Sequence, residues 1–244
     1  MKNSQIKIQT KSIISGKTGE ALLISLGIIF SVAVFSALSH IIYSLNLPVY
    51  VSIPLAVLTV FLQWLTYCAL RSGRCAWFKF YNRNNKKGRV LFWFKPKYSA
   101  KSMRFYLSLF LRKSGWTFLL LLPGVFTATS FVLLAADGGI ELNLFLCGII
   151  GGGVMLILGM AFRFLIIQKY FLAQYLFVSD PKIKVRDALR QSTALMNGKL
   201  KKTALFKLSF IPWFILCIGI LPSVYVLPYY RQSCVMYADN CIKN

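Results

Sequence analysis

Long apolar runs alternate with short polar segments along this chain. The runs cover residues 21–43, 49–70, 116–135, 142–162 and 203–220. Each is close to the length of about 20 residues that a helix needs to cross a hydrocarbon core about 30 Å thick. The pattern predicts an all-α, polytopic helical membrane protein with about five or six transmembrane helices plus cytoplasmic interfacial amphipathic helices. We treat residues 1–244 as a single membrane domain.

Prolines predict where these helices depart from regular geometry. Pro123-Gly124 lies inside the third run, where the missing backbone donor predicts a kink or a break. Pro212 predicts a bend in the fifth run or a late start near that residue. The last apolar segment, residues 222–241, is interrupted by Pro222, Pro228 and Arg231, so it is either a sixth span or a broken, half-inserted helix.

The first run raises the question of a signal peptide. It extends from residue 21 to residue 43 and follows a short basic N-terminus. A signal-peptide core is only about 7–15 residues long, and here more apolar runs follow. We therefore expect the first run to be retained as a helix.

Charge then sets the expected orientation. Lys and Arg total 29 against 6 Asp and Glu, giving a net charge of +23. The cations gather in residues 1–19, 71–113 and 163–207, whereas the connectors 44–48 and 136–141 carry none. With five spans, all three basic regions fall on one side, and the positive-inside rule makes that side the cytoplasm. We expect a multi-pass protein with a cytoplasmic N-terminus.

The strongly basic region 71–113 allows two interpretations. Aromatic residues interleave with its cations, as in Trp77-Phe78 and Phe92-Trp93-Phe94, a pattern that in a soluble protein would favour stacking on single-stranded nucleic acid. Because spans on both sides tether this region to a bilayer, we interpret 71–113 and 163–202 as basic cytoplasmic loops on the anionic leaflet. The expected partners are membrane lipids and a membrane protein that the sequence does not identify; nucleic acid is not expected.

Residues 185–196 have the pattern of an amphipathic surface helix. Apolar or small residues recur at helical spacing, from Val185 through Ala188-Leu189 and Ser192 to Met196. Asn197-Gly198 supplies a stop signal. The helix leads directly into the fifth run, which we expect it to position. Three basic residues at this junction are candidate contacts for lipid head groups: Lys199, Lys201 and Lys202.

Glycines crowd the fourth apolar run. Gly148 and Gly152 are four residues apart and form a small-xxx-small face, which lets another helix approach closely. We interpret this face as a helix-packing surface, with a pore or substrate groove as the alternative.

The sequence contains no recognisable catalytic constellation. The acidic residues are scattered, and the single histidine, His40, cannot complete a Cys/His zinc set. We expect no enzyme activity, no metal site and no cofactor. Cys234 and Cys241 can pair only if the C-terminal segment is extracytoplasmic and not helical, because residues seven apart on a helix are separated by about 10.5 Å along its axis.

Residues 173–237 resemble the bacterial integral-membrane family called domain of unknown function 975. That family has a short Asp/Pro turn, a helix with an Ala-Leu…Ser…Met-x-Gly-x-Lys pattern, a Leu-Ser-Phe-Ile-x-Trp span start, a Gly-Ile and a Pro-Tyr. The matching residues here are Asp180, Pro181, Ser192, Met196, Gly198, Lys199, Ser209, Phe210, Trp213, Gly219, Pro228 and Tyr229. The order and spacing are similar over about a quarter of the chain.

The chain also departs from the family pattern. Lys199 follows Gly198 directly, so Lys201 or Lys202 is the alternative counterpart of the family lysine, and Pro212 stands where glycine is usual. The resemblance implies a helical bundle in the bacterial cytoplasmic (plasma) membrane, and it implies no activity.

The sequence bears on three classes of function. The first class, an enzyme, is disfavoured because the sequence contains no recognisable catalytic constellation. A transporter or channel component for a small molecule, lipid or peptide would use charges within the membrane, for which Arg163, Lys169 and Arg231 are the candidates. The pattern favours the third class, a non-catalytic accessory, membrane-organising or immunity-type protein that acts through helix and lipid contacts.

Overall fold

The computed structural model describes residues 3–15, 18–45, 47–84, 90–136, 138, 141–216 and 220–243. These residues form helices and short turns, with no strand among them, so the predicted all-α fold class is confirmed. Within the described part of the chain, four helices are long and apolar enough to cross a membrane.

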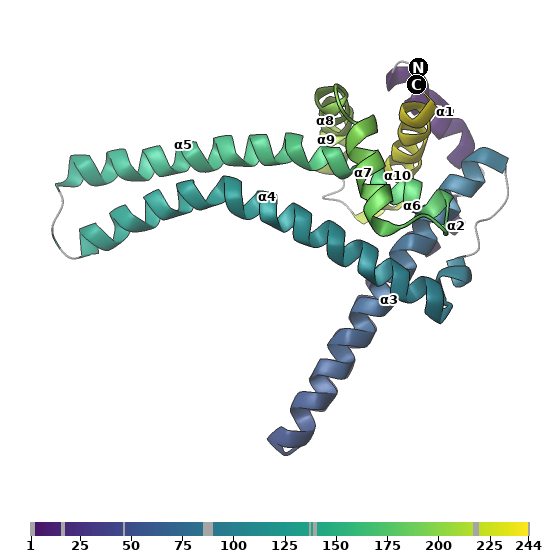
Figure 1. Cartoon of the computed structure of the whole chain (residues 1–244), viewed down its shortest axis with the longest axis horizontal. Coiled ribbons are helices and arrows are strands. Elements are labelled where there is room, and N and C mark those ends of the chain that lie inside the picture. The colour runs from purple at the N-terminus through teal and green to yellow at the C-terminus, as the bar shows by residue number, and fades with distance from the viewer. Residues whose placement is uncertain are drawn as a thin grey trace.

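Two helical hairpins provide these four helices. The first pairs α2 (Thr18–Ser44) with α3 (Val49–Asn84), and the second pairs α4 (Pro96–Ala136) with α5 (Leu142–Ile167). Figure 1 shows α4 and α5 side by side, while α3 leaves the centre of the molecule in a different direction. The predicted first four spans lie within these helices, and the two hairpins diverge from a common base.

The remaining elements pack together where the hairpins meet. We call this part the hub; it comprises the described residues of 3–15, 68–109 and 168–243. Its own elements are α1 (Asn3–Ile14), η1 (Val90–Phe94), η2 (Gln168–Tyr170), α6 (Ala173–Ser179), α7 (Val185–Leu195), α8 (Leu200–Leu208), α9 (Ile211–Leu216) and α10 (Ile220–Lys243).

Region 71–113 differs from the expected basic loop. The helix α3 continues to Asn84 and α4 begins at Pro96, so most of this region is helix. Its aromatic residues explain the difference, because Trp77, Phe78 and Trp93 are buried in the hub instead of lying at a membrane surface. In region 163–202 the predicted surface helix is present as α7, with Ala188 and Leu189 on its buried face.

The C-terminal third is also arranged differently from a simple span. The expected fifth span, residues 203–220, is divided among α8, α9 and the start of α10, and residues 217–219 lie outside the described residues. The expected sixth segment is one continuous helix, α10, which passes through Pro228 without a break. Helix α4 likewise continues through Pro123, and Figure 1 shows it bent, not broken.

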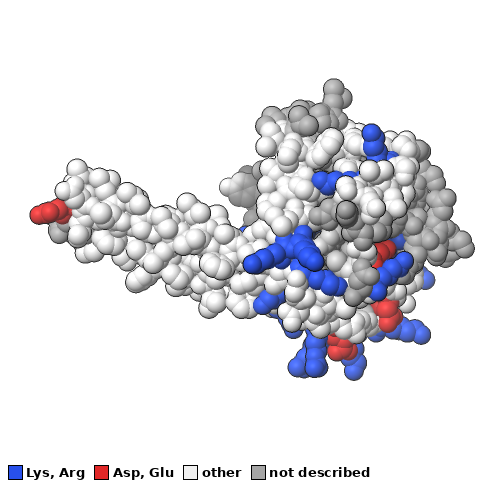
Figure 2. All heavy atoms as spheres, turned by 90° about the horizontal axis from the view of Figure 1, so that it is seen from above, with Lys and Arg blue, Asp and Glu red and all other residues white. Residues whose placement is uncertain are grey.

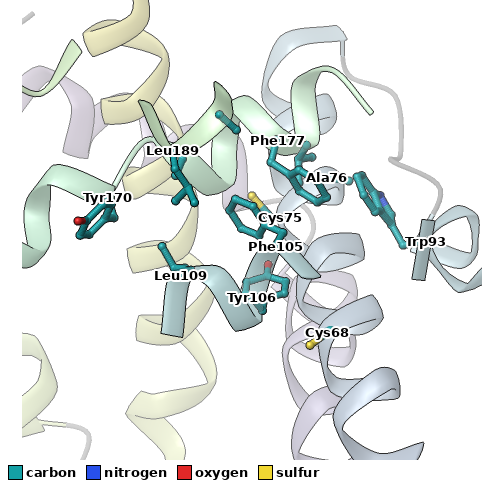
Figure 3. Packing of buried hydrophobic residues seen from close by; sticks show 13 residues of the cluster. Cys68, Cys75, Ala76, Trp93, Phe105, Tyr106, Leu109, Tyr170, Phe177 and Leu189 are labelled. Carbon is teal, nitrogen blue, oxygen red and sulfur yellow. The ribbon is translucent and has the colours of Figure 1, made fainter. Parts of the chain in front are cut away.

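Aromatic contacts hold the hub together. Figure 3 shows the first cluster, in which Phe105 of α4 and Phe177 of α6 stack with ring centroids 4.3 Å apart, beside Leu189 of α7. A second cluster joins α1, α8 and α10, with Phe206 stacked on Tyr237 at 4.3 Å. Rings of this size dominate the energetics of a core.

A buried ion pair links three helices of the hub. The ammonium of Lys79 on α3 lies 3.4 Å from a carboxylate oxygen of Asp239 on α10 and donates a hydrogen bond of 3.1 Å to the carbonyl of Tyr175 on α6. Removing one charge of such a buried pair is destabilising, because the attraction that offsets the desolvation of the other charge is lost.

The hairpins, in contrast, expose large apolar side chains. Phe30 on α2 is 71% exposed, and Phe118 and Phe126 on α4 are 71% and 70% exposed. Contiguous apolar surface of this extent is unfavourable in water and suits contact with lipid. The chain is therefore described as a helical membrane protein.

Glycines determine how closely α4 and α5 approach. A side chain on Gly148 would meet the ring of Phe131 at 2.2 Å, and one on Gly152 would meet the backbone nitrogen of Ala128 at 3.0 Å. Both predicted packing glycines therefore face α4. Gly159 is closer still to backbone, since an added Cβ would lie 2.4 Å from the carbonyl oxygen of Leu120.

Candidate functional site

Charge is separated along the molecule. No Lys or Arg occurs in residues 18–70 or 114–162, which contain most of the two hairpins. Figure 2 shows the α4–α5 hairpin white along its length and red at its tip, with blue side chains at the opposite, hub end. The cations of the described residues are thus gathered at one end of two apolar hairpins.

The family-pattern residues of the α6–α7 turn make local contacts. A carboxylate oxygen of Asp180 accepts a hydrogen bond of 2.8 Å from the backbone N–H of Lys182. The carbonyl of Pro181 accepts a hydrogen bond from the ammonium of Lys101 on α4. This turn therefore attaches α7 to the base of the second hairpin.

The next group of these residues surrounds the α7–α8 turn. The hydroxyl of Ser192 donates a hydrogen bond of 2.8 Å to the carbonyl of Lys169, and Met196 is fully buried. Gly198 has a φ of +74°, a left-handed conformation that glycine adopts without strain, and it reverses the chain into α8. The ammonium of Lys199 donates a hydrogen bond of 3.1 Å to the carbonyl of Cys241 near the end of α10.

The last group forms the corner between α8 and α9. The ammonium of Lys7 on α1 donates a hydrogen bond of 3.2 Å to the carbonyl of Ser209 and lies 4.5 Å from the ring centre of Phe210. Partial burial in this corner lowers the pKa of Lys7 from its usual value. The ring of Trp213 lies 6.1 Å from that of Tyr229, whose hydroxyl donates to the carbonyl of Lys7 at 3.4 Å.

The remaining family-pattern residues are Pro228 and Gly219. Pro228 lies inside α10, and Gly219 lies outside the described residues. The described members of the pattern thus connect α1, α7, α8 and α10 within the hub, and none of the contacts above brings a nucleophile together with a base.

The three predicted lipid-contact lysines have different surroundings. Lys199 directs its ammonium to α10, as described above, whereas Lys201 and Lys202 are exposed on α8. Cys234 and Cys241 lie two turns apart on α10 as free thiols, so the helical geometry keeps them beyond disulfide reach.

The cations considered for transport lie near the hub end of the second hairpin and on α10. The guanidinium of Arg163 donates a hydrogen bond of 2.7 Å from Nε to the hydroxyl of Thr117, which joins α5 to α4. The ammonium of Lys169 lies 5.6 Å from the ring centre of Trp116, and the guanidinium of Arg231 lies 6.0 Å from that of Tyr230.

A cavity that the sequence does not reveal lies between the two hairpins. It has a volume of about 540 Å³ and is lined by residues of α2, α3 and α4. Arg71 and Lys113 contribute its charged groups, and Tyr67 and Tyr106 contribute aromatic walls. A guanidinium nitrogen of Arg71 donates a hydrogen bond of 3.0 Å to the hydroxyl of Tyr67, and the same guanidinium lies 4.9 Å from the ring centre of Tyr106.

The position of these two cations in the sequence gives a partial signal for the cavity. Arg71 is the first basic residue after the second apolar run, and Lys113 is the last basic residue before the third. Both therefore mark the boundary of the apolar region, where lipid phosphates are found. Both residues line one cavity because α3 and α4 pack against each other. A single sequence does not reveal this helix packing.

Comparison with known proteins gives a family and no function. No curated protein and no solved structure matches the chain. The family model described as "Protein of unknown function (DUF975)" matches residues 1–244, which extends the resemblance seen in residues 173–237 to the whole length. The chain therefore belongs to this family, Protein of unknown function (DUF975).

Proposed function

We propose that this chain is a non-catalytic protein of the bacterial plasma membrane that acts through contacts with anionic lipids. In this proposal the hub lies at the cytoplasmic face and the two hairpins enter the bilayer. The role is that of an accessory or membrane-organising protein, which gathers lipids around the base of its hairpins.

One observation carries this proposal, namely the separation of charge along the molecule. Residues 18–70 and 114–162 contain no Lys or Arg, while the hub and the adjoining helix ends contain the described cations. A basic side chain near an anionic membrane surface contributes about 1 kcal/mol of attraction. Several such side chains at one level favour anionic over zwitterionic lipids in the surrounding shell.

The composition of that lipid shell provides the test. The protein is reconstituted in bilayers, and tryptophan fluorescence is quenched with brominated phosphatidylglycerol or brominated phosphatidylcholine. We expect phosphatidylglycerol to associate several times more strongly, and the preference to shrink as salt rises, because the Debye length falls to about 3 Å at 1 M. Equal association of the two lipids at low salt would contradict the proposal.

Substitutions locate the source of the preference. Replacing both Lys201 and Lys202 by Gln removes two exposed cations of the hub and should reduce the preference for phosphatidylglycerol. Glu141→Gln, at the opposite end of the α4–α5 hairpin, is the control and should leave the preference unchanged.

A further inference from the structure

The cavity between the two hairpins has a charged end. Arg71 of α3 and Lys113 of α4 both line it. A guanidinium carries five N–H donors, and one from Arg71 is given to the hydroxyl of Tyr67. Within the described residues, no carboxylate is paired with either cation. Two like charges in one cavity repel each other, so an anion between them would be favourable.

The end of the cavity away from these cations has an apolar wall whose side chains are exposed. Val32 of α2, Val60 of α3 and Phe110 of α4 are 40%, 61% and 57% exposed, and all three line the cavity. The apolar wall is therefore built jointly by α2, α3 and α4. An acyl chain lying along this wall would pack against all three side chains and gain dispersion contacts with each.

Aromatic residues separate the two ends of the cavity. Trp64 and Tyr67 are stacked on α3 with ring centroids 6.0 Å apart, and Trp64 also meets the ring of Phe110 on α4 at 6.5 Å. Trp and Tyr favour the head-group level of a bilayer, where one part of the ring is apolar and another is polar. The half-buried amide of Gln63 lies at the same cavity and can bond to ester or glycerol oxygens.

We propose that this cavity holds one anionic phospholipid. Its phosphate lies between Arg71 and Lys113, and an acyl chain lies along Val60 and Phe110 in the angle between the hairpins. A guanidinium suits a phosphate because it can bond to two of its oxygens at once. The inference rests on the proposed lipid-contact function and deepens it, since it assigns one lipid to one defined site.

The chemistry of the cavity favours a lipid over a helix of a partner protein. A partner helix would have to place an acidic side chain at this depth to pair with the cations, and such residues are rare in membrane segments. An anionic phospholipid, in contrast, always carries a phosphate, and cations that flank apolar runs are expected at the head-group level. The volume of about 540 Å³ falls within the range of roughly 300–1,000 Å³ that is usual for ligand pockets.

Native mass spectrometry of the detergent-purified full chain tests the inference. Dioleoyl phosphatidylglycerol is titrated against dioleoyl phosphatidylcholine, and inorganic phosphate is added as a competitor. We expect one phosphatidylglycerol to be retained per protein, with phosphatidylcholine bound more weakly and inorganic phosphate unable to displace the lipid. Replacing both Arg71 and Lys113 by Gln should lower the apparent affinity roughly tenfold or more, because charge-assisted hydrogen bonds are lost.

A second variant blocks the apolar end and leaves both cations in place. Val60→Trp puts a large side chain into the cavity from an exposed position, so we expect loss of the retained lipid without loss of helical content. Val57→Trp is the matched control, because Val57 is 64% exposed on the same helix and does not line the cavity. Circular dichroism and gel filtration confirm that each variant is folded.

The outcomes separate this inference from the proposed function. Retention of phosphatidylglycerol by both Val60→Trp and the Arg71/Lys113 double variant would overturn the single-lipid site, even if the lipid shell still prefers anionic lipids. Displacement by inorganic phosphate would also overturn it, since the ligand would then be free phosphate. Replacing Lys201 and Lys202 by Gln should reduce the shell preference alone and leave the retained lipid bound.

Discussion

At the scale of single residues, two buried glutamines of the hub have opposite surroundings. Gln168 is satisfied on both sides, because its amide nitrogen donates to the carbonyl of Phe164 at 2.8 Å and its amide oxygen accepts from the ammonium of Lys207 at 2.6 Å. Gln232 on α10 is fully buried, and neither polar atom of its amide has a hydrogen-bond partner among the described residues. A buried amide without partners destabilises the fold.

Gln232→Met should therefore stabilise the protein. Methionine has nearly the same shape and no amide to satisfy, so we expect a gain of about 1–3 kcal/mol in the free energy of unfolding. Gln168→Met should have the opposite effect, since Lys207 would lose its acceptor inside the hub. Thermal unfolding in detergent, followed by tryptophan fluorescence, measures both. A lower midpoint for Gln232→Met would mean that its amide is satisfied in the folded hub.

At the scale of elements, α5 has two kinds of glycine. Gly159 is pressed against α4, because an added Cβ would lie 2.4 Å from the carbonyl oxygen of Leu120. Gly151 has open space around it, with no atom within 4 Å of an added Cβ. Replacing each glycine by alanine therefore distinguishes the effect of close helix packing on stability from the effect of helix propensity.

Gly159→Ala should weaken the second hairpin. The atom in the way belongs to the backbone and cannot rotate aside, so the helices must move apart, at a cost of about 1–3 kcal/mol. Gly151→Ala adds the same methyl group where space is free and should be neutral or stabilising by up to about 1 kcal/mol. The difference between their thermal midpoints in detergent is the measurement, and equal midpoints would argue against the close approach at Gly159.

The elements also show what a single sequence can predict. The first four apolar runs predict the membrane helices well, because length and hydropathy alone decide whether a helix can cross a bilayer. The pattern does not show that α3 extends to Asn84, because alternating aromatic and basic residues fit a membrane surface as well as a core. Burial of Trp77 and Trp93 depends on partners from distant parts of the chain.

The candidate site was predictable to a smaller extent. The junction of a surface helix with an apolar run predicts that Lys201 and Lys202 are available to contact lipid head groups, and both are exposed in the structure. Lys199 has the same local signal, yet its ammonium contacts the end of α10 through a turn that only the fold creates. Arg71 on α3 and Lys113 on α4 are more than forty residues apart in the sequence. They line one cavity only because α3 and α4 pack against each other.

At the scale of the whole molecule, the arrangement favours one orientation in a membrane. Both hairpins leave the hub with their connections at the far ends, and the described cations lie at the hub end. Translocating the hub would carry these cations across the bilayer, which the positive-inside rule opposes. The tip of the first hairpin, residues 44–48, is uncharged, and the tip of the second, residues 136–141, carries only acidic residues. These two tips are the parts expected to cross the bilayer.

Thiol accessibility in intact cells tests this orientation. Of the described cysteines, Cys147 is exposed and the others are buried, and Cys217 lies outside the described residues. A Cys147→Ser/Cys217→Ser background should therefore give little labelling with a membrane-impermeant maleimide. Glu141→Cys at the tip of the second hairpin should then be labelled from outside.

The hub provides the opposite probe in the same background. Gln191 is exposed on α7, so Gln191→Cys should be labelled only after the cells are permeabilised. The two cysteines should be labelled from opposite sides of the membrane, because α7 and the α4–α5 tip lie at opposite ends of one folded unit. Labelling of Gln191→Cys in intact cells, with Glu141→Cys protected, would place the cationic hub outside. The anionic cytoplasmic leaflet would then not be its partner, and the proposed lipid contacts would lose their physical basis.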